Sequence, residues 1–261
     1  WANANNGDNQ NFSLHASTTS GILFKYRSAI EFDLTPIPDY SDIRDASCYL
    51  YWYDTTATWC AHRSLNGYNN STLNRITTSW DEHTITWNTI PTYSATDYLS
   101  IPYTTSTTQD IDVSTTGFIQ KWIDNEWPNY GLLYKLVDET VYKDIYFASS
   151  DRWKQNIRPK VYVEYVEPIA INCEVNDISI IDTLMGSAEI IDASGGVPPY
   201  TYLWDNGSES EYVELCWIGK HYVTVTDFRD SSSIFKLNFL GDILWSEGIG
   251  VEQQHDSLVK T

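Results

Sequence analysis

Positive charge and long apolar runs are both scarce in this sequence. Lysine and arginine number 16 against 35 aspartates and glutamates, which gives a net charge of −19 over 261 residues. Such a charge repels phosphate backbones and anionic headgroups, so we exclude nucleic acid and membrane surfaces as partners. No apolar stretch approaches the roughly 18 residues of a membrane span, which excludes membrane insertion. Residues 1–20 lack a basic start followed by an apolar core, so we interpret the chain as already processed.

Methionine occurs once, whereas aromatic residues are abundant, with 19 Tyr, 11 Trp and 8 Phe. Serine and threonine are frequent in the first two thirds of the chain. This usage is typical of strands rather than helices. The composition therefore predicts an all-β, secreted protein, and the length favours two domains.

Alternating apolar and polar residues predict most strands of the first domain. The alternation covers residues 22–34 and 46–53, and residues 59–65 are expected to return as the antiparallel partner of the second strand. Further strands are predicted over residues 131–136, 141–148 and 160–166. A short amphipathic helix follows Asp112, where apolar residues recur at spacings of three and four: Phe118, Ile119, Trp122 and Ile123.

A change of amino-acid composition near residues 167–171 marks the domain boundary. Pro168 cannot prolong the preceding strand, and glycine and proline become more frequent beyond it. We assign residues 1–167 to the first domain, 172–240 to the second and 241–261 to a polar tail. In the second domain, Asn206-Gly207 predicts a hairpin turn, and the last strands are expected over 221–226 and 234–240.

The four cysteines form no CxxC pair and lie beside no histidine at zinc-finger spacing, so a zinc site is not expected. An even number in a secreted chain favours disulfides within each domain, Cys48 with Cys60 and Cys173 with Cys216. The alternative is that all four are free, buried thiols.

No catalytic constellation is visible. The five histidines are scattered, and neither HExxH nor GxSxG occurs. Adjacent acids such as Asp81-Glu82 and Asp138-Glu139 are expected by chance in so acidic a chain. The sequence therefore favours a protein that is not an enzyme.

Two segments carry candidate ligand-binding residues. Tyr49, Tyr51 and Tyr53 alternate along one strand, and aromatic faces aligned in this way stack on sugars while their hydroxyls form hydrogen bonds. Cross-strand packing is the alternative. The Asn-rich residues 3–11 could form a calcium loop with Asp8 as a ligand, although an ordinary turn explains them as well. No other cofactor is expected.

Several motifs of the first domain resemble the DNRLRE domain in the family's order. The central one is LNRITTSWDEHTITWNTIP, and the others are RSAIEFDLTPIP, DIDVSTTGFIQKW, NYGLL and RPKVYVEY. The resemblance spans residues 5–165 and implies a secreted jelly-roll β-sandwich of the carbohydrate-binding kind, without catalysis. Some relatives bind acidic polysaccharides, which the net charge of −19 disfavours here unless calcium bridges the two. Trp80 and Trp87, which flank a polar turn, are expected to anchor in the core. Family members usually carry a further strand before residue 5.

The segment SGGVPPYTYLWDNGSESEYVELCWIGKHYVTVTDF resembles the SprB-like repeat of gliding bacteria, which is similar to polycystic-kidney-disease domains. This implies a small immunoglobulin-like sandwich that acts as a spacer, with Tyr200, Tyr202 and Trp204 packing its core. The family's terminal Cys is replaced by Arg229-Asp230-Ser231, which again pairs Cys216 with Cys173.

The tail GIGVEQQHDSLVKT resembles the linker before a type A sorting domain of type IX secretion substrates, which implies a surface protein of the Bacteroidota. Three short matches to the O-glycosylation pattern of that group mark Thr55, Thr183 and Ser257 as acceptor candidates.

Three functions compete at this level. The first is a secreted, non-catalytic adhesion or structural protein of the cell surface, with a polysaccharide or surface glycan as its candidate partner. The second is a filament subunit that self-associates by strand donation from residues 241–261. The third is a polysaccharide-degrading enzyme, which the missing catalytic residues disfavour.

Overall fold

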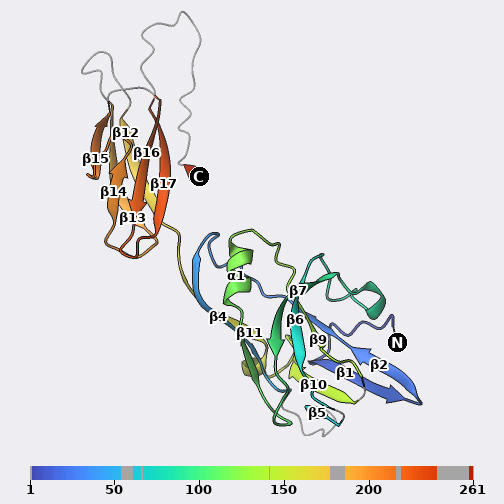
Figure 1. The fold of residues 1–261 in the computed structure, drawn as a ribbon. Helices are drawn as coiled ribbons and strands as arrows, with labels where there is room; N and C mark the ends of the chain where they lie inside the picture. The colour runs from blue at the N-terminus through green and yellow to red at the C-terminus, as the bar shows by residue number, and fades with distance from the viewer. Residues whose placement is uncertain are drawn as a thin grey trace, which may run out of the picture. The chain divides into compact units, whose positions relative to one another are not determined.

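Figure 1 shows the computed structural model of the chain, which describes residues 2–53, 61–65, 67–140, 142–176, 186–215, 219–239 and 259–260. The chain divides into two compact units, Trp1–Tyr165 and Val166–Thr261. Each unit is built almost entirely of strands around its own apolar core. The predicted all-β class is therefore confirmed.

The first unit is a β-sandwich of antiparallel strands. Its first layer contains the sheets β2-β1-β10-β5 and β11-β4-β8, and its second layer is the sheet β3-β9-β6-β7. The strands of the first layer are β1 (Asn11–Thr19), β2 (Ile22–Tyr26), β10 (Lys143–Ala148), β5 (Arg63–Ser64), β11 (Lys160–Val166), β4 (Asp42–Leu50) and β8 (Ile111–Ser114). Those of the second layer are β3 (Ser28–Ile30), β9 (Leu132–Leu136), β6 (Ser71–Ile76) and β7 (Tyr93–Ile101).

The chain beyond β4 joins the two sheets of the first layer. The Ala148 amide donates to the Tyr51 carbonyl at 2.9 Å, and Trp52 forms an isolated antiparallel bridge with Phe147. Side chains alternate across these strands, so every second residue enters the core. On β4 the inward residues are Ala46, Cys48 and Leu50, as the sequence predicts.

The predicted helix is confirmed as α1 (Thr116–Ile123), which buries Ile119, Trp122 and Ile123. Gln120 ties it to the start of β4, because its side chain accepts from the Ile43 amide at 2.8 Å and donates to the Ser41 carbonyl at 3.0 Å. The helix thereby covers one end of the sandwich core.

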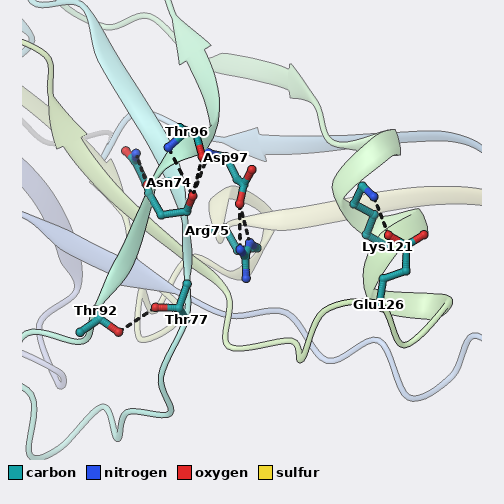
Figure 2. A network of polar contacts seen from close by, with 9 residues as sticks. Asn74, Arg75, Thr77, Thr92, Thr96, Asp97, Lys121 and Glu126 are labelled. Carbon is teal, nitrogen blue, oxygen red and sulfur yellow. Dashed lines mark hydrogen bonds and ion pairs between the residues drawn. The ribbon is translucent and has the colours of Figure 1, made fainter.

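A network of polar contacts lies beside this helix. Figure 2 shows Arg75 of β6 reaching Asp97 of β7, with Nη2 to Oδ2 at 2.8 Å. The guanidinium also lies 4.3 Å from the centroid of the Trp127 ring, and Nζ of Lys121 lies 5.0 Å from the same centroid. Hydrogen bonding to Arg75 lowers the pKa of Asp97. The indole thus has two cations close to it, which stabilise the segment after α1.

Two expectations about strand pairing are wrong. Residues 22–34 form two strands, because β2 pairs with β1 whereas β3 pairs with β9, and the chain changes sheet at Arg27. The end of that segment, up to Leu34, lies outside any strand but still contributes Leu34 to the core. Arg63–Ser64 pair with β10 and not with β4, whose partners are β8 and β11.

The second unit is also a sandwich, because its core draws on two sheets, β12-β13-β15 and β14-β16-β17-β18. Its strands are β12 (Ala170–Asn176), β13 (Gly186–Ser194), β15 (Tyr212–Leu215), β14 (Thr201–Trp204), β16 (Gly219–Thr226), β17 (Ser232–Phe239) and β18 (Val259–Lys260). Trp204 is buried in this core, and Tyr200 and Tyr202 pack against it, as expected. Asn206-Gly207 forms a turn, in which the Gly207 amide donates to the Trp204 carbonyl at 2.9 Å, but the predicted hairpin is wrong because β14 and β15 belong to different sheets.

Candidate functional site

A cavity of about 1660 Å³ is lined by residues of β1, β2 and β3. The N-terminal segment and the loop from Trp80 to Ile90 also line it. Aromatic and polar side chains line it, among them Ser13, His15, Tyr26, Tyr53, Trp87 and Tyr146. Concave, aromatic-lined sites with a few polar groups are the usual form of small-molecule and sugar sites.

Two lining residues of the cavity, His15 and Tyr26, belong to a row of side chains that crosses three strands in register. His15 of β1 faces Tyr26 of β2 on one side and Asp144 of β10 on the other. Nδ1 of His15 lies in close contact with Oδ1 of Asp144, and the rings of His15 and Tyr26 meet edge to face with centroids 5.6 Å apart. Because Leu14 and Ala16 occupy the alternate positions in the core, His15 must project outward.

The N-terminal segment is tied to the loop that forms the far wall. The side-chain amide of Asn5 donates to the carbonyls of Glu82 and Ile85, both at 2.7 Å. A Cβ at Gly7 would lie 2.5 Å from the Glu82 carbonyl oxygen, so only glycine allows this approach. The segment thereby becomes part of the cavity wall.

These contacts bear on the calcium prediction for Asp8. Its side chain is 89% exposed, and Oδ1 lies 3.4 Å from Nδ1 of His83. Within the described ranges, no group of three or more His, Cys, Asp or Glu side chains is arranged to hold a metal ion. Calcium binding at Asp8 stays a prediction.

Trp87 is an exposed side chain of the cavity wall, and its predicted role as a core anchor is wrong. It begins a 3₁₀ turn, Trp87–Thr89, and is 39% exposed. The guanidinium carbon of Arg27 lies 4.9 Å from the centroid of its ring. Trp80 is half-buried and donates from Nε1 to the Tyr130 carbonyl at 2.8 Å, but it also lines the cavity and does not belong to the core cluster.

The guanidinium of Arg27 also binds the carboxylate of Glu139. Two guanidinium nitrogens donate to the two carboxylate oxygens at 2.6 and 2.9 Å, and Nζ of Lys25 adds a contact at 3.3 Å. Hydrogen bonding to Glu139 raises the pKa of Arg27. Burial opposes ionisation of Glu139, but the two cations outweigh it and lower the pKa of that carboxyl. The two cations of the cavity wall therefore share one carboxylate, which offsets one of their two positive charges.

The three tyrosines of the predicted row have different neighbours. Tyr49 and Tyr51 stack with ring planes 16° apart and centroids separated by 6.5 Å. Nζ of Lys160 lies 5.8 and 5.2 Å from these centroids, and its hydrogen bond to Tyr51 raises its pKa. Tyr53 lines the cavity and packs against Arg152, whose guanidinium carbon is 4.3 Å from the ring centroid.

The cysteine and glycosylation predictions fall largely on undescribed residues. Cys48 is buried and Cys173 half-buried, and no disulfide joins these two described cysteines. Their predicted partners, Cys60 and Cys216, lie outside the described residues, and so do Thr55, Thr183 and Ser257. The disulfide pairings and the glycosylation sites stay predictions.

The comparisons with known proteins bear directly on the first unit. A model of carbohydrate-binding module family 96 matches residues 1–165, which hold the whole cavity. The chain belongs to this family. Membership of family 96 gives the first unit a carbohydrate-binding, non-catalytic role.

Residues 186–209 of the second unit match the SprB repeat, which suggests the context of a surface protein. The search of curated proteins gives no match. Among the described helices, none has the length and apolarity to span a membrane.

Proposed function

We propose that the first unit binds a polysaccharide in the cavity, and that the protein acts as a non-catalytic adhesion or structural component at the cell surface. The exposed ring of Trp87 in the wall of this cavity carries the proposal. Aromatic rings pack against the CH faces of sugars, and the neighbouring polar groups then bind hydroxyls. Family membership supplies the ligand class.

The charges of the cavity favour an uncharged sugar. Lys25 and Arg27 line it but are bound to Glu139. The remaining charged lining residues are acidic, apart from the titratable His15: Asp8, Glu31, Asp81 and Glu82. With a net charge of −19 on the whole chain, approach of a uronic acid polymer is opposed by repulsion.

The experiment is binding to β-1,3-glucan, xylan, mannan and alginate, measured by retention in affinity gels. We expect Trp87→Ala to weaken retention on the bound polysaccharide by at least about tenfold, the equivalent of about 1.4 kcal/mol. Phe228→Ala is the control, because Phe228 is 71% exposed but belongs to the second unit. Equal retention of Trp87→Ala and the parent protein would contradict the proposal. Saturable release of reducing ends would contradict the non-catalytic role.

The proposed surface location has two further supports. The SprB match and the resemblance of the tail to a type IX sorting linker both favour export to the cell surface. Surface biotinylation of intact producing cells tests this location. Labelling of the protein is expected, and recovery only from lysed cells would contradict it.

One observation favours a second candidate function, self-association by strand donation. Strand β18 pairs with the edge of β17, with Lys260 opposite Phe235 and Val259 opposite Lys236. A strand that adds to a sheet edge in this way can also add to the same edge of another copy. Under this hypothesis, deleting residues 259–261 converts oligomers to monomers in sedimentation velocity. Monomers before and after deletion would rule it out.

A further inference from the structure

We infer that a bound polysaccharide continues out of the cavity along Tyr53, Tyr51 and Tyr49, so that the site takes an internal stretch of a linear, uncharged chain. This inference rests on the proposed function. It adds a second binding segment on the outer face of β4 and β11, and with it a dependence of affinity on chain length.

The two segments are continuous along the backbone. Tyr53 lines the cavity, and Tyr51 and Tyr49 precede it at alternate positions of the same extended chain. The bridge between Trp52 and Phe147 keeps this chain extended beyond the end of β4. Four residues at a rise of 3.3 Å place Tyr49 about 13 Å along the sheet from Tyr53.

A second strand makes the same connection. Pro159 lines the cavity, and Lys160 follows it as the first residue of β11. Lys160 then lies across the rings of Tyr49 and Tyr51. Two strands therefore lead from the cavity to one aromatic surface.

This surface offers the groups that bind an uncharged sugar chain. Tyr162 is 56% exposed on β11, at alternate spacing from Lys160. Asp112 of β8 is exposed directly opposite Tyr49 in the register, which places a carboxylate acceptor beside the rings. Among the described residues, Lys160 forms no ion pair with a carboxylate, so its remaining protons are free to donate to sugar hydroxyls. Rings, a donor and an acceptor thus occur together on three neighbouring strands.

Pure structural packing is the competing explanation for these tyrosines. Packing alone predicts that their removal changes stability but not the dependence of binding on ligand length. A ligand track predicts the opposite for an exposed member such as Tyr162. The dependence of affinity on ligand length therefore distinguishes the two explanations, because a loss of stability does not change it.

The experiment compares trisaccharides with octasaccharides prepared from β-1,3-glucan, xylan and mannan, by titration calorimetry. We expect the parent protein to bind the octasaccharide at least about tenfold more tightly, which corresponds to about 1.4 kcal/mol. Tyr51→Ala and Tyr162→Ala should remove that gain and leave the trisaccharide affinity within about twofold. Tyr162→Ala keeps the test valid if Tyr51→Ala does not fold, and Phe228→Ala serves as the control.

The outcomes separate this inference from the proposed function. A parent protein with equal affinity for both lengths, or variants that keep the full gain, would overturn the inference while cavity binding stands. Unchanged trisaccharide binding by Trp87→Ala would overturn the cavity instead. If the parent binds no oligosaccharide of the panel, both are rejected.

Discussion

Arg27 and Trp87 form a stacked pair in which the guanidinium carbon lies 4.9 Å from the ring centroid. Because Glu139 binds the same guanidinium through both oxygens, the cation cannot turn away from the indole. One face of Trp87 is thereby supported from behind while the side chain remains exposed. A binding ring held by a fixed partner loses little conformational entropy when a ligand arrives.

The first prediction concerns this support. Arg27→Met keeps an aliphatic stem but leaves Glu139, whose side chain is only 13% exposed, with Lys25 alone. We expect the first unit to lose about 1.5–3 kcal/mol of unfolding free energy, the range for hydrogen bonds to charged groups. Lys25→Met is the control and should cost less, because its single contact is 3.3 Å long. Urea denaturation measures both, and equal losses would contradict the assigned role of Arg27.

The second prediction concerns acid stability at Asp138. Its carboxylate accepts from Nζ of buried Lys143 at 2.6 Å and from Thr140, and these bonds lower its pKa from 3.8 to about 2. A depressed folded-state pKa means that the interaction stabilises the fold above pH 3.8 and is lost as the pH falls towards 2. Asp138→Asn should therefore weaken the dependence of the melting temperature on pH between pH 3.8 and about pH 2. Asp45→Asn is the exposed control, and calorimetry from pH 7 to 2 is the measurement.

The third prediction concerns Gly131, whose φ is +74° at the start of β9. A Cβ there would lie 2.1 Å from the Ile30 carbonyl oxygen, so alanine must displace the backbone of β3. We expect Gly131→Ala to destabilise the first unit by at least about 2 kcal/mol. Gly117→Ala in α1 is the matched control, because nothing lies within 4 Å of its Cβ, and it should stabilise by up to about 1 kcal/mol. A neutral Gly131→Ala would contradict this packing.

The fourth prediction concerns the thiol of Cys48. Burial raises its pKa to about 12, so the thiolate that reacts with iodoacetamide is scarce at pH 8. We expect no labelling of Cys48 in the folded protein and full labelling after denaturation without a reductant. Peptide mass spectrometry measures both. Labelling only after reduction would instead support the predicted disulfide with Cys60.

Local patterns predict much of this fold. The alternation of β4, β9, β10 and β11 and the spacing of α1 depend on near neighbours in sequence, and the structure confirms these elements. The sheet that a strand joins is decided instead by its pairing with strands that are distant in sequence. Residues 22–30 read as one strand, yet β2 and β3 pair with different partners. Strand β1 is polar apart from Phe12, Leu14 and Ala16, and pairs with β10 more than 120 residues away.

The candidate site could be predicted only in part. The alternation of Tyr49, Tyr51 and Tyr53 predicts a common face, but the cations beside them, Lys160 and Arg152, come from distant segments. Trp87 resembles a core residue in sequence, because nothing local indicates that Arg27 supports it at the surface. The alternation of Ser13, Leu14, His15 and Ala16 is the signal from which the outward position of His15 could have been found.

The attachment of Asn5 to the loop at Glu82 and Ile85 affects how the protein should be handled. Ala2 lines the cavity, so a purification tag fused on the N-terminal side of this residue begins next to the proposed sugar site. Trimming by an aminopeptidase past Asn5 would remove both of its hydrogen bonds and loosen that part of the cavity wall. Immobilisation on a sensor chip should therefore use the opposite terminus.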